Sequence, residues 1–484
     1  MGIIAKQTTN NVLIIVVAFA IGGINTLVFY PVFLSAEQYG LVVFLLASSN
    51  MLMPLIGFGI NQTIIKFFSS YDTAEEKQRF MSSVIWLPFL IALIVGGIGV
   101  FFYNVISNAL SITNPVIAEY TWVIYVVALA TAYFEIFYAW ARVQLQSVAG
   151  NALKEIFPRL FLFVLLILLF FFSLSFKSFV IALVCGYYLR LLLMIIIAHR
   201  YYPICLSFQF PKNFRSILVY ALYIVLAASA GSLLLDIDKF MIPQIQAIQQ
   251  TAFYAVAIFA ATIVEVPSRA MGQILNPLVA IAINNGNQKE VENLYKKSAL
   301  NLVIVSGWFF LLINLNSKAL FGLLPDVGYR SATLVVLYIS LAKMITMIFG
   351  CGSAIISNSS FYRISLVFSI GMALGVALLN SYWIPRYGID GAALATLVVV
   401  LSSTGVKIMY LFYTIKIHPF SWNMFTSLLV MTGLYFCCKQ LSFSGHPIVQ
   451  IALLSTVVSV VYFVLIVRLK LSEDLLRLGK RLMK

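Results

Sequence analysis

The sequence has few charged residues, and this scarcity excludes most soluble proteins. Charged residues make up 10% of the 484 positions and hydrophobic residues 62%. Soluble domains carry about 25% charged residues, and a mean hydropathy of +1.01 leaves too few polar side chains to cover a water-exposed surface. We therefore expect an integral membrane protein.

Histidine and cysteine are too scattered for the sites that they usually build. The three histidines have no partner motif and the five cysteines lack paired spacing, so we expect neither a disulfide framework nor a zinc site. The lysine-bearing loop that binds ATP phosphates is also absent. A membrane-embedded glycosyltransferase or acyltransferase would need catalytic carboxylates or histidines at a membrane face, where only scattered acids occur. We expect no enzymatic activity, cofactor or metal.

Apolar stretches long enough to cross a bilayer are abundant. A helix of about 20 apolar residues spans the hydrocarbon core, and about fourteen such stretches occur. The first stretch is expected to stay as a helix, since no small-residue cleavage site follows it. The expected spans are residues 12–34, 40–65, 82–106, 116–141, 156–176, 178–198, 217–242, 251–279, 298–317, 331–356, 364–383, 390–414, 421–438 and 448–467.

The net charge of +15 is arranged by side of the membrane and not for nucleic acid. Most lysines and arginines fall on alternate connections between the expected spans. By the positive-inside rule these connections and both termini are cytoplasmic, which requires an even number of spans. The basic tail, residues 469–484, is expected to contact membrane lipids.

The order of long span, tight outer turn, span and charged inner loop recurs in the second half of the chain. Six spans in each half keep the two copies parallel, with an axis along the membrane normal and substrate expected between them. We expect a six-helix N-terminal lobe, a cytoplasmic linker with Pro203 and Pro211, a six-helix C-terminal lobe, two appended helices and the basic tail. Their bounds are 1–200, 201–216, 217–416, 417–468 and 469–484.

The turn in residues 379–396 carries a family resemblance. It reads LNSYWIPRYGIDGAALAT, in which Pro385 ends one helix, Gly388 and Gly391 permit a tight reversal, and small residues let the next helix pack closely. This turn resembles that of the oligosaccharide flippases, including O-antigen flippases, of the multidrug/oligosaccharidyl-lipid/polysaccharide exporter superfamily. Further matching features are Tyr39-Gly40, Gly57-Phe58-Gly59, Lys66, Asp238-Lys239-Phe240, Tyr254, Pro267 and Pro277.

The resemblance implies an all-α fold of two six-helix bundles around a central cavity, with two further C-terminal helices. It also implies a substrate, a glycan on a polyprenyl pyrophosphate, which moves from the inner to the outer leaflet of a bacterial inner membrane. Alternating access of two lobes about the linker would move it, with a proton or sodium ion as a coupling partner. We expect a monomer.

Ionisable residues near the middle of the spans are the candidate site. Arg190 and Lys343 lie near the midplane and have no acid at i±3 or i±4, so they are the first candidates to bind pyrophosphate or an acidic sugar. A structural link to a distant acid or to helix-end carbonyls is the alternative. Glu265 and Arg269, at i and i+4, either form a local ion pair or exchange a proton near Pro267.

Two further groups complete the set. Glu135 shares a helix face with Arg142, and either lines the cavity or forms a tertiary pair. The group of Asp236, Asp238 and Lys239, near the outer end of a span, is a candidate for gating or coupling, with interfacial hydration as the alternative.

A proton- or sodium-coupled multidrug antiporter of the same superfamily is the nearest alternative function. An antiporter for organic cations would be expected to have an acid-centred cavity. The midplane charges here include Arg190, Arg269 and Lys343 against Glu265, and cationic lining favours an anionic, lipid-linked substrate.

Overall fold

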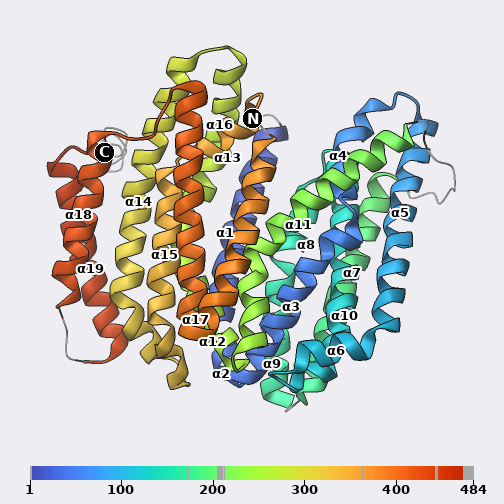
Figure 1. Cartoon of the computed structure of the whole chain (residues 1–484), viewed down its shortest axis with the longest axis horizontal. Coiled ribbons are helices and arrows are strands. Elements are labelled where there is room, and N and C mark those ends of the chain that lie inside the picture. The colour runs from blue at the N-terminus through green and yellow to red at the C-terminus, as the bar shows by residue number, and fades with distance from the viewer. Residues whose placement is uncertain are drawn as a thin grey trace. The chain divides into compact units, whose positions relative to one another are not determined.

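The computed structural model describes residues 3–172, 174–203, 211, 213–361, 363–441 and 445–472, and every regular element in these ranges is a helix (Figure 1). The expected all-α membrane fold is therefore confirmed. Half of the linker expected at residues 201–216 and most of the basic tail expected at residues 469–484 lie outside the described residues.

Twelve helices in the described residues are long and apolar enough to cross a membrane. They coincide with the expected spans, apart from two differences in how the C-terminal ones are divided. Helix α17 (Ile364–Ile415) contains two expected spans, and the 18-residue α18 (Trp422–Lys439) falls outside the twelve. The protein is thus a multi-pass membrane protein, and about fourteen remains an approximate count.

Helix α17 is a hairpin of two antiparallel arms. Gly388 is non-helical at φ 58° and ψ −137°, in the left-handed half of backbone space that glycine tolerates. Packing between the arms follows from this reversal: Lys407 Nζ lies 3.7 Å from Met372 Sδ, and the rings of Phe368 and Tyr410 are 6.3 Å apart. The turn in residues 379–396 thus reverses the chain as expected from its proline and glycines.

By contacts the chain divides into two compact units, unit 1 (Met1–Ala252) and unit 2 (Phe253–Lys484). The division falls one helix later than the linker suggested by the sequence, because α11 (Phe214–Ile245) packs against α3 (Ala36–Gly57) of unit 1. The lobes bounded at 200 and 217 remain a prediction.

Unit 1 is built around α3, α7 and α11, which lie side by side, with α10 also against α7 (Figure 1). Ser35 caps α3 through a capping box with Gln38. The elements of unit 1 besides α3 and α11 are α1 (Ile3–Ile24), η1 (Asn25–Phe29), α2 (Tyr30–Phe33), α4 (Ile60–Phe67), η2 (Phe68–Ser70), α5 (Ala74–Phe101), α6 (Tyr103–Ser111), α7 (Val116–Arg142), α8 (Val148–Glu155), α9 (Phe157–Phe172) and α10 (Phe176–Tyr201).

Unit 2 is built on the long helix α14, against which α15, α18 and α19 pack. Figure 1 shows these four helices side by side, in yellow through red. Helix α12 (Gln249–Thr262) begins at the division between the units. The other elements of unit 2 are η3 (Ile263–Glu265), α13 (Val266–Asn284), α14 (Gln288–Gly322), η4 (Val327–Ala332), α15 (Thr333–Ile348), α16 (Gly352–Asn358) and α19 (Pro447–Arg468).

Several expected spans are interrupted, among them the one at 82–106, which breaks at Phe102 between α5 and α6. The span at 40–65 breaks where Phe58 and Gly59 both take positive φ, and the span at 331–356 breaks at Gly350, with φ 50°. The span at 251–279 passes through the short 3-10 turn η3. Non-helical backbone at membrane depth is tolerated only where protein or water satisfies it, so these breaks mark positions held by tertiary packing.

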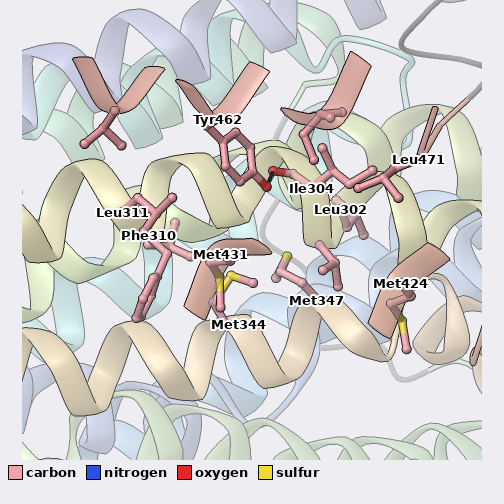
Figure 2. Packing of buried hydrophobic residues seen from close by; sticks show 14 of the residues in the cluster. Leu302, Ile304, Phe310, Leu311, Met344, Met347, Met424, Met431, Tyr462 and Leu471 are labelled. Carbon is pink, nitrogen blue, oxygen red and sulfur yellow. Dashed lines mark hydrogen bonds between the residues drawn. The ribbon is translucent and has the colours of Figure 1, made fainter. Parts of the chain in front are cut away.

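The core of unit 2 is an apolar cluster rich in methionine. Figure 2 shows Met344 and Met347 of α15 close to α14 residues and to Met431 of α18. Tyr462 of α19 donates a hydrogen bond to the carbonyl oxygen of Ile304 on α14, at 2.8 Å (Figure 2). The two last helices are therefore anchored on α14 by packing and by polar contacts.

Candidate functional site

Glu265 lies at a break in the helix that the sequence predicts for residues 251–279. Helix α12 ends at Thr262, and Pro267 lies in the first turn of α13. Proline is tolerated there because the N–H groups of a first turn have no hydrogen-bond partner within their own helix. The carboxylate therefore sits at the N-terminal end of α13, where the helix dipole favours negative charge. This local geometry follows from the proline.

The carboxylate of Glu265 meets two cations. Its Oε2 lies 2.5 Å from Lys343 Nζ on α15, and its Oε1 lies 3.9 Å from Arg269 Nε on α13. A local ion pair with Arg269 was one of the two interpretations that the sequence offered. The sequence did not predict the shorter contact with Lys343, although a link to a distant acid was the stated alternative for that lysine.

Neighbouring residues fix the position of this cluster, which we call the Glu265 cluster and define as Glu265, Arg269 and Lys343. Val264 is fully buried and Met344 is 3% exposed, and both belong to the apolar core of unit 2. Because each is adjacent in sequence to a charged member, packing of the core holds Glu265 and Lys343 at its edge. A cluster placed in this way is pre-organised for binding.

The Glu265 cluster carries one more positive than negative charge and remains accessible. The side chains of Glu265 and Lys343 are each 26% exposed, and that of Arg269 is 51% exposed. The Lys343 ammonium and the Arg269 guanidinium are donors suited to phosphate oxygens. The cluster can therefore bind an anion.

Arg190 of unit 1 lies in a different environment. It is 6% exposed, and its guanidinium carbon lies 4.2 Å from the ring centre of Phe134 and 5.0 Å from that of Tyr187. Its Nη2 is 3.5 Å from Thr131 Oγ1, and its Nε has no hydrogen-bond partner. Arg190 is thus enclosed by aromatic rings.

A small hollow adjoins Arg190 and is lined mainly by α9 and α10. It leaves about 10 Å³ for the centres of water molecules, which is room for about one water. A sugar or a pyrophosphate does not fit there without movement of the walls. The lining residues are Phe157, Pro158, Phe161, Leu162, Leu183, Gly186, Tyr187 and Arg190.

Glu135 pairs with a residue that the sequence did not single out for it. Its Oε1 lies 2.7 Å from Lys154 Nζ on α8, whereas Arg142 is exposed and lies over the ring of Tyr138 at 5.6 Å. Glu135 therefore forms a tertiary ion pair, which was one of the two interpretations from the sequence, and its partner is Lys154.

Asp236 is buried between α11 and α3. Its Oδ1 lies 2.6 Å from Lys239 Nζ, and its Oδ2 accepts a hydrogen bond of 3.2 Å from the Asn50 side chain. Asp236 is 8% exposed and Asp238 is 7% exposed, so hydration at the membrane surface does not account for either of them. No sequence signal identifies Asn50, because only the packing of α3 against α11 brings it to this carboxylate.

The described residues contain no group of three or more His, Cys, Asp or Glu side chains that could hold a metal ion. The charges come together in small sets within each unit, and the chemistry that these sets offer is electrostatic.

Comparison with solved structures shows the fold. The lipid II flippase MurJ in an inward closed conformation is similar with a TM-score of 0.68 and 14% identity, covering 95% of this chain and 99% of that one. An inward-facing multidrug resistance MATE family transporter of the MOP superfamily has a TM-score of 0.63 and 15% identity, covering 82% and 94%. A MOP superfamily transporter from Pyrococcus furiosus, described as having reverse polarity of its binding pocket, has a TM-score of 0.57 and 16% identity, covering 85% and 96%.

The sequence comparison identifies the family. The sequence matches no curated protein. The family model described as polysaccharide biosynthesis protein matches residues 8–274, more than half of the chain. The fold is similar to those of a flippase and of a transporter, and the family match confirms the resemblance drawn from the sequence. The chain belongs to the polysaccharide biosynthesis protein family.

Proposed function

We propose that the protein is a flippase for a polyprenyl-pyrophosphate-linked oligosaccharide, such as an O-antigen or other polysaccharide repeat unit. It would act as a monomer in the bacterial inner membrane, with both termini cytoplasmic, and move its substrate to the outer leaflet by ion-coupled alternating access. One observation carries the choice of an anionic substrate. The Glu265 cluster holds two cations against one carboxylate, lies within two helices that are long and apolar enough to cross a membrane, and is partly exposed.

The membership in a polysaccharide biosynthesis family supports a glycan substrate. The cationic excess supports the flippase over a multidrug antiporter, because an organic cation would be repelled by Lys343 and Arg269. The similarity to MurJ, a lipid II flippase, supports the transport of a lipid-linked group by this fold.

The assignment of the pyrophosphate contacts follows from exposure. We assign Lys343 and Arg269 to the pyrophosphate, because their donors are accessible. Arg190, Glu135 and Arg142 are proposed as further substrate contacts, and Arg190 can serve only if the rings of Phe134 and Tyr187 move aside.

Gating or coupling is proposed for Glu265 and for the group Asp236, Asp238 and Lys239. A carboxylate that pairs with a lysine can be paired in one conformation of the helices and separated from the lysine in another. Contacts with two such states suit a transport cycle.

A deletion strain tests the proposal. Loss of the protein should lead to accumulation of lipid-linked oligosaccharide on the cytoplasmic side, with unchanged resistance to cationic dyes. Complementation by the wild type should clear the intermediate, and Lys343→Gln at equal abundance should not. Loss of dye resistance without accumulation of the lipid intermediate would instead support the antiporter.

A further inference from the structure

The Glu265 carboxylate occupies the position that an anionic substrate would take. It sits 2.5 Å from Lys343 Nζ and also faces Arg269, so the binding cations already have a ligand in the substrate-free protein. A charge-assisted contact of this length between an ammonium and a carboxylate is strong. An anion that takes the place of Glu265 beside Lys343 has to displace this carboxylate first.

A membrane makes this internal ligand significant. Phospholipids present a phosphodiester with a single negative charge along both surfaces of the bilayer, at far higher abundance than any polyprenyl intermediate. An uncovered pair of cations on a partly exposed helix face would be filled by these lipids. A protein that selects a rare ligand against an abundant one needs an element that disfavours the abundant one.

We propose that Glu265 is a charge filter, which reserves Lys343 and Arg269 for headgroups that carry at least two negative charges. Replacing one carboxylate by one phosphodiester leaves the charge balance of the Glu265 cluster unchanged and offers no net gain. A diphosphate carries two or more negative charges and several acceptor oxygens, so it can contact both cations. The attraction gained from the second charge compensates for the contact that Glu265 loses. The inference rests on the proposed function and adds the charge class that the site accepts.

The position of Glu265 suits a residue that exchanges partners. It lies at the junction of η3 and α13, where Pro267 interrupts the helix, and its side chain is 26% exposed. The released carboxylate remains at the N-terminal end of α13, where the helix dipole still favours its charge. Lys343, by contrast, is on a continuous helix that the buried side chains of Met344 and Met347 hold in place.

The test uses the full chain in nanodiscs of zwitterionic phosphatidylcholine with increasing fractions of phosphatidylglycerol. Soluble farnesyl diphosphate is the probe for binding. For the wild type we expect binding of farnesyl diphosphate that is insensitive to phosphatidylglycerol beyond general surface charge. For Glu265→Gln we expect phosphatidylglycerol to compete, and to weaken apparent binding of the probe by about tenfold, the usual scale of one lost charge contact at partial exposure.

Two variants control the result. Glu292→Gln removes one negative charge from the Glu292–Lys296 pair of α14, whose atoms lie 2.6 Å apart, and should behave as the wild type does. Glu265→Asp keeps the negative charge and should still exclude phosphatidylglycerol. This variant provides a second test of the charge at position 265 if the Gln variant folds poorly.

The outcomes separate the filter from the function. If farnesyl diphosphate binds in a Lys343-dependent manner but phosphatidylglycerol does not compete in Glu265→Gln, the filter is wrong and the flippase proposal stands. The filter is also wrong if Glu265→Asp admits phosphatidylglycerol as Gln does. If the wild type shows no Lys343-dependent binding of the diphosphate, the headgroup site of the proposed function fails together with the filter.

Discussion

Two charges of unit 1 and two of unit 2 lie in contrasting surroundings. Arg190 and Asp236 of unit 1 are 6% and 8% exposed and are enclosed by aromatic rings or by a neighbouring helix. Lys343 and Arg269 of unit 2 have side chains that are 26% and 51% exposed. An enclosed charge stabilises the contacts between helices, whereas an accessible one remains available to a ligand. Position at membrane depth alone does not distinguish these two uses.

The largest expected effect is on the stability of unit 1. Asp236→Ala removes the partner of Lys239 and Asn50 and leaves a partly buried ammonium without its carboxylate. We expect the free energy of unfolding to fall by about 3 kcal/mol, measured by thermal or denaturant unfolding in detergent. Glu75→Ala, which removes an exposed pair with Arg79, is the control and should change it by less than about 0.5 kcal/mol. Equal effects would remove the contrast between enclosed and exposed charges.

The second prediction addresses function in unit 2. Lys343→Gln should lower binding of a diphosphate headgroup by about 2 kcal/mol, or about 30-fold, because a charge-assisted hydrogen bond is lost. Thermal stability should change little, since Glu265 keeps Arg269 as a partner. Arg190→Gln is the counterpart in unit 1. We expect it to lower the stability of the protein more than it lowers the transport rate per folded molecule. The reverse pattern would assign the headgroup to unit 1.

The third prediction concerns the break at the end of α15, the helix that carries Lys343. Gly350 has φ 50°, and an added Cβ would meet Ser298 Oγ and the backbone of Ala299 on α14. Gly350→Ala should therefore cost about 2 kcal/mol, from backbone strain and from crowding. Gly388→Ala has open space around it, but φ 58° with ψ −137° is a conformation that glycine almost alone adopts, so strain by itself should cost at least about 1 kcal/mol. Comparison of the two midpoints of unfolding separates packing from strain.

The smallest effect is expected in the anchor of the last two helices. Tyr462→Phe removes the hydrogen bond to the Ile304 carbonyl while keeping the ring in the core of unit 2. Hydrogen bonds between membrane helices contribute about 0.6 kcal/mol on average, and we expect a loss of that order. A loss of unfolding free energy as large as that expected for Asp236→Ala would show that α18 and α19 contribute more to the stability of unit 2 than peripheral packing against α14.

Part of the candidate site could be predicted from the sequence, and part could not. The pair of Glu265 and Arg269 follows from their spacing on one helix, and the two residues do face each other. The contact of Glu265 with Lys343 and that of Glu135 with Lys154 join different helices, so no spacing rule predicts them. The breaks at Gly59 and Gly350 could not be predicted, because a glycine can also lie within a regular membrane helix. The positive φ of these two glycines is seen only in the tertiary structure.

The sequence by itself determined the membrane location, the helical fold and the order of the spans. These properties depend on hydropathy and on the need to satisfy every backbone hydrogen bond within a segment, and both are local. Tertiary structure decided which charges are enclosed and which are accessible, because burial and pairing depend on neighbours far apart in the chain. Lys343 therefore has a carboxylate at 2.5 Å, although no acid lies near it in sequence.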